Sequence, residues 1–288
     1  MFSKYSIVCL VIEQGSFTNV ANKLGYTQSA VSQMIKSVEQ EFDTMLIKRG
    51  RDGISLTKDG EDYYPFLLNI YNAEKALNRK MHEMKGLEDN TIRIGTFTSV
   101  SRNLLPGIMK AFKEIYPGVH YILQQGEYTS IANWIKEGSI DFGFHGLDDL
   151  PGLEYQKLYR DEMMAVLPPD HPLTVYESLS LSDLADEPLI VLDEGEYSHT
   201  IHAFEKAEIT PRIEYTVTDD YSILAMVREG LGVSLIYKKM LSGYNDKAEV
   251  RPIIEAPYRD VSVCWDKWET MPLSSRRFIK YLLEDKQE

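Results

Sequence analysis

The segment Gly15–Lys36 places the strongest constraint on what this chain folds into, because it predicts two short helices joined by a tight turn. In the first helix, apolar residues recur at i, i+3, i+4 and i+7, which puts them on one face. Ser16 is a good N-terminal cap for that helix, and Gly25 suits the left-handed residue that ends it. Thr27 caps the next helix only two residues later. The apolar positions of the first helix are Phe17, Val20, Ala21 and Leu24.

The second predicted helix has two chemically different faces. At about 100° per residue its short polar side chains fall within an arc of about 140°, and its apolar side chains fill the opposite arc. Amides and hydroxyls with a single Lys can hydrogen-bond to base edges and phosphates, which favours a helix in the DNA major groove. An amphipathic helix pair inside an ordinary globular domain is the alternative. The polar set is Gln28, Ser29, Ser32, Gln33 and Lys36, and the apolar set is Ala30, Val31, Met34, Ile35 and Val38.

The distribution of charge removes an objection to DNA binding. The formal net charge is −13, yet residues 1–60 contain seven Lys or Arg and six Asp or Glu. Phosphates repel the acidic remainder, which leaves the N-terminal segment to contact DNA. Lys48, Arg49 and Arg51 lie beside two glycines, and we interpret them as a basic wing that contacts the DNA backbone or minor groove. A solvated turn is the simpler alternative.

Thr57 begins a long helix that we extend to about Lys85. Its apolar residues alternate steps of four and three, a heptad pattern interrupted by Glu74 and strained by Pro65. The helix could pack within its own subunit, but a dimerising helix is favoured because a two-fold pair of reading helices needs a spacer. The predicted seam is Tyr63, Leu67, Ile70, Glu74, Leu77, Met81 and Met84.

The polar segment 86–90 ends this helix, and we place a domain boundary there. Beyond it, strands and helices alternate, which predicts an α/β sheet with ligands near strand-to-helix turns. The predicted strands are 91–95, 119–124, 140–144, 162–167, 189–192, 213–218 and 233–237, and the predicted helices are 104–116, 130–137, 182–185, 200–207 and 221–229.

Composition excludes several classes of protein. No run reaches the roughly 18 apolar residues of a membrane span, and the N-terminal residues lack the basic start of a secretory signal. Cys9 and Cys264 are too few for a disulfide framework or a zinc site, which favours a reducing cytoplasm.

Two sets of spaced residues resemble one family, the LysR-type transcriptional regulators. The first set resembles its winged helix-turn-helix and the second its effector-binding domain, so the resemblance covers nearly the whole chain. Val20, Asp43 and Ile47 replace a common Ala, Gly and Phe without threatening the fold, since Asp tolerates a left-handed conformation. The first set is Gly15–Thr18, Ala21, Leu24, Thr27–Ser32, Ile35, Glu39, Leu46, Arg49, Leu56, Thr57 and Gly60. The second is Ile94, Gly95, Leu104–Pro106, Tyr116, Pro117, Ile140–Gly143, Pro168, Asp170–Leu173, Ser182–Leu184 and Glu229–Val233.

The resemblance implies an α/β protein in three parts. These are a winged helix-turn-helix at 1–60, a linker helix at 58–86, and a periplasmic-binding-protein-like (type II) effector domain at 91–288. Subdomain I would take about 91–162 and 266–288, and subdomain II about 163–265. We therefore expect crossovers near Glu162 and Cys264, and a C-terminal helix around 276–283 packed on subdomain I.

The implied function is sequence-specific DNA binding and transcriptional regulation, modulated by a small-molecule effector and without enzymatic activity. The resemblance implies an interrupted palindrome in double-stranded DNA, a dimer formed through the linker helix, and tetramers of paired dimers. RNA polymerase is a further candidate partner, and no membrane is involved.

The candidate DNA contacts are the polar set of the second helix, with Thr27 on a phosphate or as a cap and Arg49 and Arg51 in the wing. Gln28 and Gln33 are the specificity candidates because Gln pairs bidentately with adenine. Glu39 points nearly the same way as Gln28, but phosphates would repel it, so we expect an internal contact instead.

The candidate effector site begins at the turn 96–102. Hydroxyls there and free N–H groups at a helix start favour a small anion such as a carboxylate, although plain capping is the alternative. No other cofactor is expected. The candidate residues are Thr98, Ser99 and Ser101, with opposite walls from Thr129, Phe144, His145, His199, Thr200 and Thr218.

Other functions find less support. His199 and His202 near two Glu residues could bind a metal, but two imidazoles without a clear third ligand are usually structural or exposed. An enzyme is disfavoured because the chain has no G-x-S-x-G, P-loop, G-x-G-x-x-G or H-E-x-x-H motif. A pure solute-binding module fits the second domain alone, but it does not account for residues 1–60.

Overall fold

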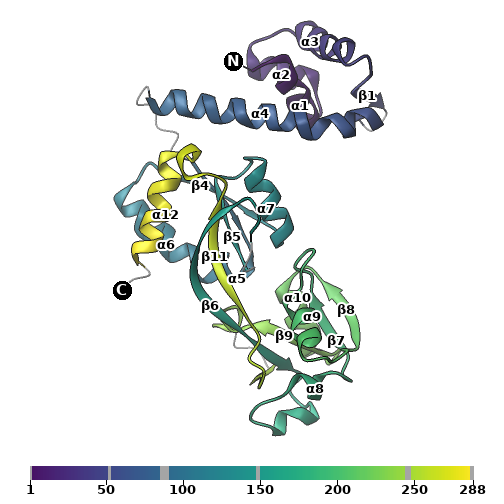
Figure 1. The fold of residues 1–288 in the computed structure, drawn as a ribbon, viewed down its shortest axis with the longest axis vertical. Coiled ribbons are helices and arrows are strands. Elements are labelled where there is room, and N and C mark those ends of the chain that lie inside the picture. Colours follow the sequence, from purple (N-terminus) through teal and green to yellow (C-terminus); the bar gives the residue numbers. More distant parts are fainter. Residues whose placement is uncertain (1, 51–52, 85–90, 147–149, 244–247, 286–288) are drawn as a thin grey trace. The chain divides into compact units, whose positions relative to one another are not determined.

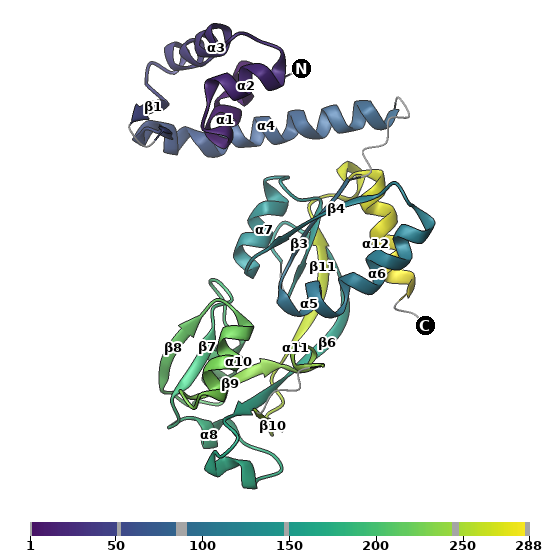
Figure 2. The same cartoon turned by 180° about the vertical axis from the view of Figure 1, so that it is seen from behind.

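The structure, a computed structural model, describes residues 2–50, 53–84, 91–146, 150–243 and 248–285. The chain divides into two compact units, which we describe separately (Figures 1 and 2). Unit 1 comprises residues 1–89 and 137–139, and unit 2 comprises residues 90–136 and 140–288.

Unit 1 is a helical bundle with a two-stranded hairpin. Polar caps fix where its first helices begin, because Ser3, Ser16 and Thr27 each accept a hydrogen bond from the backbone N–H three residues on. Gly15 and Gly25 adopt the left-handed conformation that ends the first two helices, as predicted. The elements are α1 (Lys4–Gln14), α2 (Phe17–Leu24), α3 (Gln28–Glu41), β1 (Ile47–Gly50), β2 (Gly53–Leu56) and α4 (Lys58–Met84).

The helix α4 presents two different apolar faces, so the single predicted seam needs correction. Leu67 is buried in the core of unit 1, and the carboxylate of Glu74 accepts hydrogen bonds from Ser6 Oγ (2.6 Å) and Ser3 N (2.9 Å) beside α1. These two positions therefore face the helix's own subunit. A separate row of side chains is exposed, and it consists of Phe66, Ile70, Leu77 and Met81.

Unit 2 is built on one continuous series of paired strands. Their order is β4-β3-β5-β11-β6-β9-β7-β8, and β10 pairs with β6. The strands are β3 (Thr91–Thr96), β4 (His120–Gln125), β5 (Phe142–His145), β6 (Glu154–Leu167), β7 (Leu189–Leu192), β8 (Ile213–Val217), β9 (Val233–Tyr237), β10 (Glu249–Pro252) and β11 (Tyr258–Trp265). The α-helices are α5 (Thr98–Asn103), α6 (Leu105–Ile115), α7 (Tyr128–Lys136), α8 (Leu181–Leu184), α9 (His199–Lys206), α10 (Asp220–Arg228), α11 (Lys238–Leu241) and α12 (Leu273–Asp285). Two 3₁₀ turns are η1 (Pro172–Val175) and η2 (Trp268–Thr270).

Unit 2 has two hydrophobic cores joined by long strands. The first core lies under β3, β4, β5 and β11, and the second lies under β7, β8 and β9. The strand β6 runs from one lobe into the other, with β11 antiparallel beside its first half (Figures 1 and 2). We call the first lobe subdomain I and the second subdomain II.

The first crossover lies near Glu162, as expected, but the second lies earlier than Cys264. Ile253 packs in the core of subdomain II, whereas Val261, Val263 and Cys264 of β11 pack in the core of subdomain I. The chain therefore crosses back between Ile253 and Tyr258. The helix α12 packs on subdomain I through Phe278, Ile279 and Leu282.

Both cysteines are buried thiols. Cys9 lies in the core of unit 1 and Cys264 in subdomain I. Burial raises the pKa of both thiols to about 12, so neither forms a thiolate near neutral pH.

Candidate functional site

The polar face of α3 is exposed as predicted. Gln28, Ser29, Gln33 and Lys36 are exposed, and Ser32 is half-buried. The opposite face carries the buried residues Val31, Ile35 and Val38. No hydrogen bond within the described chain holds the side chains of Gln28, Gln33 or Lys36, so these groups are free to bind a partner.

The Thr27 side chain serves as the cap of α3. Its hydroxyl accepts a hydrogen bond from Ala30 N (3.2 Å) and lies 3.0 Å from Ser29 Oγ. Capping leaves the exposed hydroxyl at the start of the reading helix, where the N-terminal dipole favours an anion such as a phosphate.

The wing is an antiparallel hairpin of β1 and β2. Lys48 is exposed on β1. Arg49 lies in β1, although its side chain falls outside the described atoms, and Arg51 lies outside the described residues. The candidate roles of these two arginines in DNA contact therefore stay predictions.

Hydrogen bonds to the Glu39 side chain connect the helix α3 to the start of the wing. Its Oε1 accepts hydrogen bonds from the backbone N–H groups of Leu46 (2.9 Å) and Ile47 (3.2 Å) at the start of β1, and the residue is buried. The predicted internal contact of Glu39 is thereby confirmed. Asp43 takes a left-handed conformation (φ 51°) in the intervening turn, which lets the chain reverse toward the wing.

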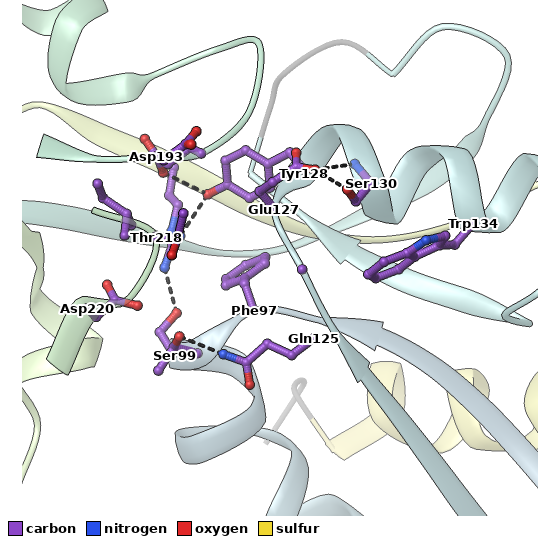
Figure 3. A pocket seen from close by; sticks show the side chains of 15 residues that line it. Phe97, Ser99, Gln125, Glu127, Tyr128, Ser130, Trp134, Asp193, Thr218 and Asp220 are labelled. Carbon is purple, nitrogen blue, oxygen red and sulfur yellow. Dashed lines mark hydrogen bonds between the residues drawn. The ribbon is translucent and has the colours of Figure 1, made fainter. Parts of the chain in front are cut away.

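Unit 2 contains a cavity of about 400 Å³ between its two subdomains. Subdomain I supplies the β3–α5 segment, the residues around the start of α7 and the strand β11, and subdomain II supplies the ends of β7 and β8 and the start of α10 (Figure 3). The cavity is lined by Phe97, Thr98, Ser99, Gln125, Gly126, Glu127, Tyr128, Ser130, Trp134, Leu192, Asp193, Glu194, Thr218, Asp220 and Arg259.

Arg259 is the buried centre of this cavity wall. Its Nη2 donates to Ser99 Oγ (2.6 Å) and to Asp161 Oδ2 (3.1 Å), and its Nη1 donates to Tyr128 OH (2.8 Å). The guanidinium carbon lies 3.4 Å from the ring centroid of Tyr237 and 4.5 Å from that of Phe97. The ion pair with Asp161 and the contacts with the rings of Tyr237 and Phe97 together hold the buried guanidinium in one orientation.

Glu194 connects the two subdomains at the same place. Its Oε1 accepts from Tyr128 OH (3.2 Å) of subdomain I and Tyr237 OH (2.7 Å) of subdomain II, and its Oε2 accepts from His199 N (2.9 Å). Burial alone would raise the pKa of Glu194, but the hydrogen bond and charge of His199 and the charge of Arg259 lower it below its ordinary value. Three donors from both subdomains thus converge on the Glu194 carboxylate.

Two sequence models match the chain, and they fall on its two units. The one described as a bacterial regulatory helix-turn-helix protein of the lysR family matches residues 3–61, and the one described as the LysR substrate binding domain matches residues 85–287. The chain belongs to the LysR family. It is a sequence-specific DNA-binding transcriptional regulator with a C-terminal effector-binding domain, and not an enzyme.

Individual LysR-family proteins agree with this membership along the whole chain. An uncharacterized HTH-type transcriptional regulator of Bacillus subtilis (strain 168), YvbU, is 32% identical over 95% of this chain and 94% of its own length. The crystal structure of the LysR-family regulator CbnR matches with a TM-score of 0.70 at 18% identity, covering 99% of this chain and 98% of CbnR. Full-length CbnR complexed with its target DNA matches with a TM-score of 0.69 at 20% identity, covering 98% of each chain.

The predicted effector residues of this LysR-family chain separate into groups. Thr98, Ser99 and Thr218 line the cavity. Ser101 does not line it, since its Oγ donates to the backbone carbonyl of Thr98 within the short helix α5. The segment expected to be a turn before the first helix is thus this helix of six residues, which begins at Thr98.

The remaining predicted effector residues lie elsewhere. Thr129 and His145 line a neighbouring cavity of about 480 Å³, and His199 lines another of about 580 Å³. Phe144 is buried in the core of subdomain I, because β5 is buried along its whole length. Thr200 is buried on α9. These positions support the walls of the cleft and do not line its central cavity.

Sequence reasoning missed the residues that organise the cavity, namely Arg259, Tyr128, Glu194 and Asp220. One of them left a signal in the sequence. Arg259 alternates with Val261, Val263 and Trp265 along β11, and all four are buried, so this Arg occupies a core-facing position of its strand. A buried Arg needs partners, which makes such a position a candidate for a site.

The described residues form neither a metal-binding cluster nor a membrane-spanning helix. No group of three His, Cys, Asp or Glu side chains there is placed to hold a metal ion. None of the described helices combines the length and apolar character that a membrane span requires.

Proposed function

We propose that α3 of this LysR-family regulator lies in the major groove and that the β1–β2 wing contacts the adjacent backbone or minor groove. The exposed row of amides and hydroxyls on α3 is the observation that carries this proposal. Gln28 and Gln33 would read base edges, while Lys36 and Lys48 would contact phosphates. The buried bond of Glu39 to the start of the wing supports a fixed geometry between the two contacts.

The exposed apolar row of α4 supports a dimer. Phe66, Ile70, Leu77 and Met81 are 40% or more exposed, and they follow one another at steps of four, seven and four residues. A second copy of α4 would cover this row and space two reading helices for an interrupted palindrome. Tetramers of paired dimers and a contact with RNA polymerase are further parts of the proposal. A regulator that binds the chromosome would act in the cytoplasm.

The cavity between the subdomains is the proposed effector site. Hydrogen bonds from both subdomains meet at Arg259 and Glu194 in its wall, so a ligand that rearranges these bonds would change the angle between the lobes. A ligand shifts such an equilibrium only by its differential affinity for the two arrangements.

The DNA proposal is tested by gel shift with the DNA upstream of this protein's own gene at several salt concentrations. Lys36→Ala should weaken binding to all sequences and lower the salt slope by about one, because it removes one phosphate contact. Gln28→Ala should lose discrimination between the site and altered sites by about 1–3 kcal/mol per affected base pair. Unchanged sequence preference in Gln28→Ala would exclude the base-reading role of that residue.

The dimer is tested by sedimentation of Leu77→Glu. A charge in the covered row should shift the protein toward monomers, whereas Lys58→Glu on the first turn of α4 is the matched control and should leave the mass unchanged. A Leu77→Glu protein that keeps the wild-type mass would place the dimer contact elsewhere.

A further inference from the structure

The cavity proposed as the effector site is rich in carboxylates. Glu127, Asp193, Glu194 and Asp220 line it, and Arg259 is the one cationic side chain among its described lining residues. The charge balance of the wall thus differs from that of a pocket built for an anion. Which charge the cavity favours depends on which of these groups already have partners.

Arg259 has little capacity left for a ligand. Asp161 balances its charge, Ser99 and Tyr128 take further N–H groups, and Tyr237 and Phe97 cover its faces. Its Nε is the one nitrogen of the group without an acceptor in the described structure. A ligand carboxylate that sought a two-point contact with this guanidinium would have to displace Asp161 or Ser99.

The start of α5 offers an anion little more. This helix has six residues, and its N-terminal dipole is correspondingly weak. A small anion was expected to accept from the hydroxyls of Thr98 and Ser99. Thr98 Oγ1 accepts from Gln125 Nε2 (2.9 Å), and the Thr98 side chain is also hydrogen-bonded to Asp220. Ser99 Oγ accepts from Arg259, so its O–H is the single hydroxyl donor of this pair that an anion could use in the described structure.

Three of the four carboxylates accept hydrogen bonds from the protein. The exposed Asp193 accepts from Gly195 N (3.0 Å). Glu127 accepts from the backbone N–H groups of Thr129 (2.6 Å) and Ser130 (2.8 Å) and so caps α7. Glu194 accepts from two phenols and a backbone N–H, as described above. None of these three groups requires a further positive charge.

Asp220 is different, because it is buried without a counter-ion. The residue is 7% exposed at the start of α10, and no salt bridge to it exists in the described part of the chain. Burial raises the pKa of Asp220, against the opposing effects of a hydrogen bond with Thr98 and the charge of Arg259. The ionised form of a buried carboxylate without a counter-ion is stabilised when a cation is placed beside it.

The rest of the cavity fits the apolar body of a small organic cation. Figure 3 shows Asp220 and Thr218 on one side of the opening, Phe97 in the middle and the Trp134 ring on the far side. The Trp134 ring packs against the backbone of Gly126, where a Cβ would come within 2.5 Å of it. A positive head group beside Asp220 would leave its body against Phe97 and Trp134.

We propose that the effector of this regulator is a small organic cation, an amine whose ammonium group pairs with Asp220 and whose apolar part lies against Phe97 and Trp134. The inference rests on the proposed function of the cavity as the effector site. It assigns to the ligand the charge opposite to the small anion expected from the hydroxyls of the 96–102 segment.

The test compares three probes of nearly equal shape on the full-length protein: 2-phenylethylammonium, 2-phenylethanol and phenylacetate. Thermal-shift measurement and calorimetry at millimolar probe should show stabilisation by the ammonium compound alone. Asp220→Asn, which keeps the shape of the side chain, should weaken that binding about tenfold or more. Glu114→Gln removes an exposed carboxylate on α6 and should leave the binding unchanged.

The outcomes separate the ligand class from the site. If phenylacetate or phenylethanol stabilises the protein better than the ammonium compound, or if Asp220→Asn binds the ammonium compound as tightly as wild type, the assigned charge is wrong. No stabilisation by any probe also counts against it. Thr218→Trp narrows the cavity and should abolish binding of whichever probe binds; binding that survives this substitution would instead overturn the cavity as the effector site. The folded state of each variant is checked by its unliganded melting temperature.

Discussion

The two polar surfaces of this molecule are built in opposite ways. On α3, Gln28, Gln33 and Lys36 are exposed and make no hydrogen bond within the described chain, so their bonding capacity is open to a partner. In the cavity between the subdomains, Arg259 and Glu194 are buried, and Tyr128 OH links them by accepting from Arg259 and donating to Glu194. The first surface gains contacts when it binds, whereas the second must exchange contacts.

The difference indicates how the regulator divides its tasks. A preformed exposed face gives affinity and sequence reading without a change of shape. A network that loses some bonds when others form can alternate between two arrangements, which is what a ligand-controlled switch requires. Substitutions should therefore affect stability strongly in the cavity and binding strongly on α3.

The largest effect on stability is expected for Arg259→Ala. It leaves Asp161 buried without its counter-ion, which should lower the free energy of unfolding of unit 2 by about 3–5 kcal/mol. All three tryptophans, Trp134, Trp265 and Trp268, lie in unit 2, so urea unfolding followed by tryptophan fluorescence reports this unit. Arg212→Ala, at an exposed ion pair, is the control and should change little. Equal effects of both substitutions would contradict the central role of Arg259.

The next effect is a loss of stability at acid pH through His145. Burial lowers the pKa of this imidazole from 6.5 to about 4, against a hydrogen bond with the Tyr128 backbone. Below about pH 6.5 the unfolded chain binds a proton that the folded chain does not, so stability is present above this pH and falls by about 3 kcal/mol toward pH 4. The same fluorescence measurement across pH 4–7 should show a shallower decline in His145→Gln. The exposed His120→Gln should follow wild type, and an identical pH profile for all three proteins would refute the assignment.

A smaller effect is expected in unit 1 from Glu39→Ala. The substitution leaves the N–H groups of Leu46 and Ile47 without their acceptor, at a cost of about 2 kcal/mol. Circular dichroism should show the helices of unit 1 melting earlier while tryptophan fluorescence of unit 2 is unchanged. Glu41→Ala, at an exposed ion pair with Lys4, serves as the comparison and should cost less. A cost no greater than that of Glu41→Ala would mean that the wing is held by other contacts.

The smallest effect on stability is expected on the reading face. Gln33→Ala should change the free energy of unfolding by less than about 0.5 kcal/mol, because the side chain is exposed and unbonded. Its affinity for the specific site should nevertheless fall by about 1–3 kcal/mol relative to random DNA. Measured together, the two values test the contrast directly, since a large loss of stability would show that α3 uses Gln33 internally.

Local signals explain why unit 1 was predictable. The bounds of α2 and α3 depend on signals that act within a few residues, namely the caps Ser16 and Thr27, the left-handed Gly25 and the helical period. The local sequence therefore suffices to predict these two helices. The internal role of Glu39 followed from its charge, because phosphates would repel a carboxylate that points nearly the same way as Gln28. The split of α4 into two faces was not predictable from spacing alone, because Glu74 contacts Ser3 and Ser6, which are distant in sequence.

The cavity between the subdomains was predictable only in part, because segments distant in sequence assemble it. Ser99, Tyr128 and Asp161 all meet Arg259, which follows Ser99 by 160 residues. The first half of β6 was missed since its side chains are largely exposed on both faces, which removes the alternating apolar signal. Without β6 and β11, the return crossover could not be placed and Cys264 was assigned to the wrong side of it.

The burial of both cysteines has a practical consequence for measuring the separation of the two subdomains in solution. A new cysteine introduced at an exposed position would be the fastest-reacting thiol of the folded protein, because Cys9 and Cys264 are buried and protonated. Pairs such as Lys113→Cys on α6 and Glu205→Cys on α9 would carry fluorophores on subdomains I and II without removal of the native thiols. Energy transfer between the two dyes would then report in real time whether the distance between the subdomains changes when a ligand is added.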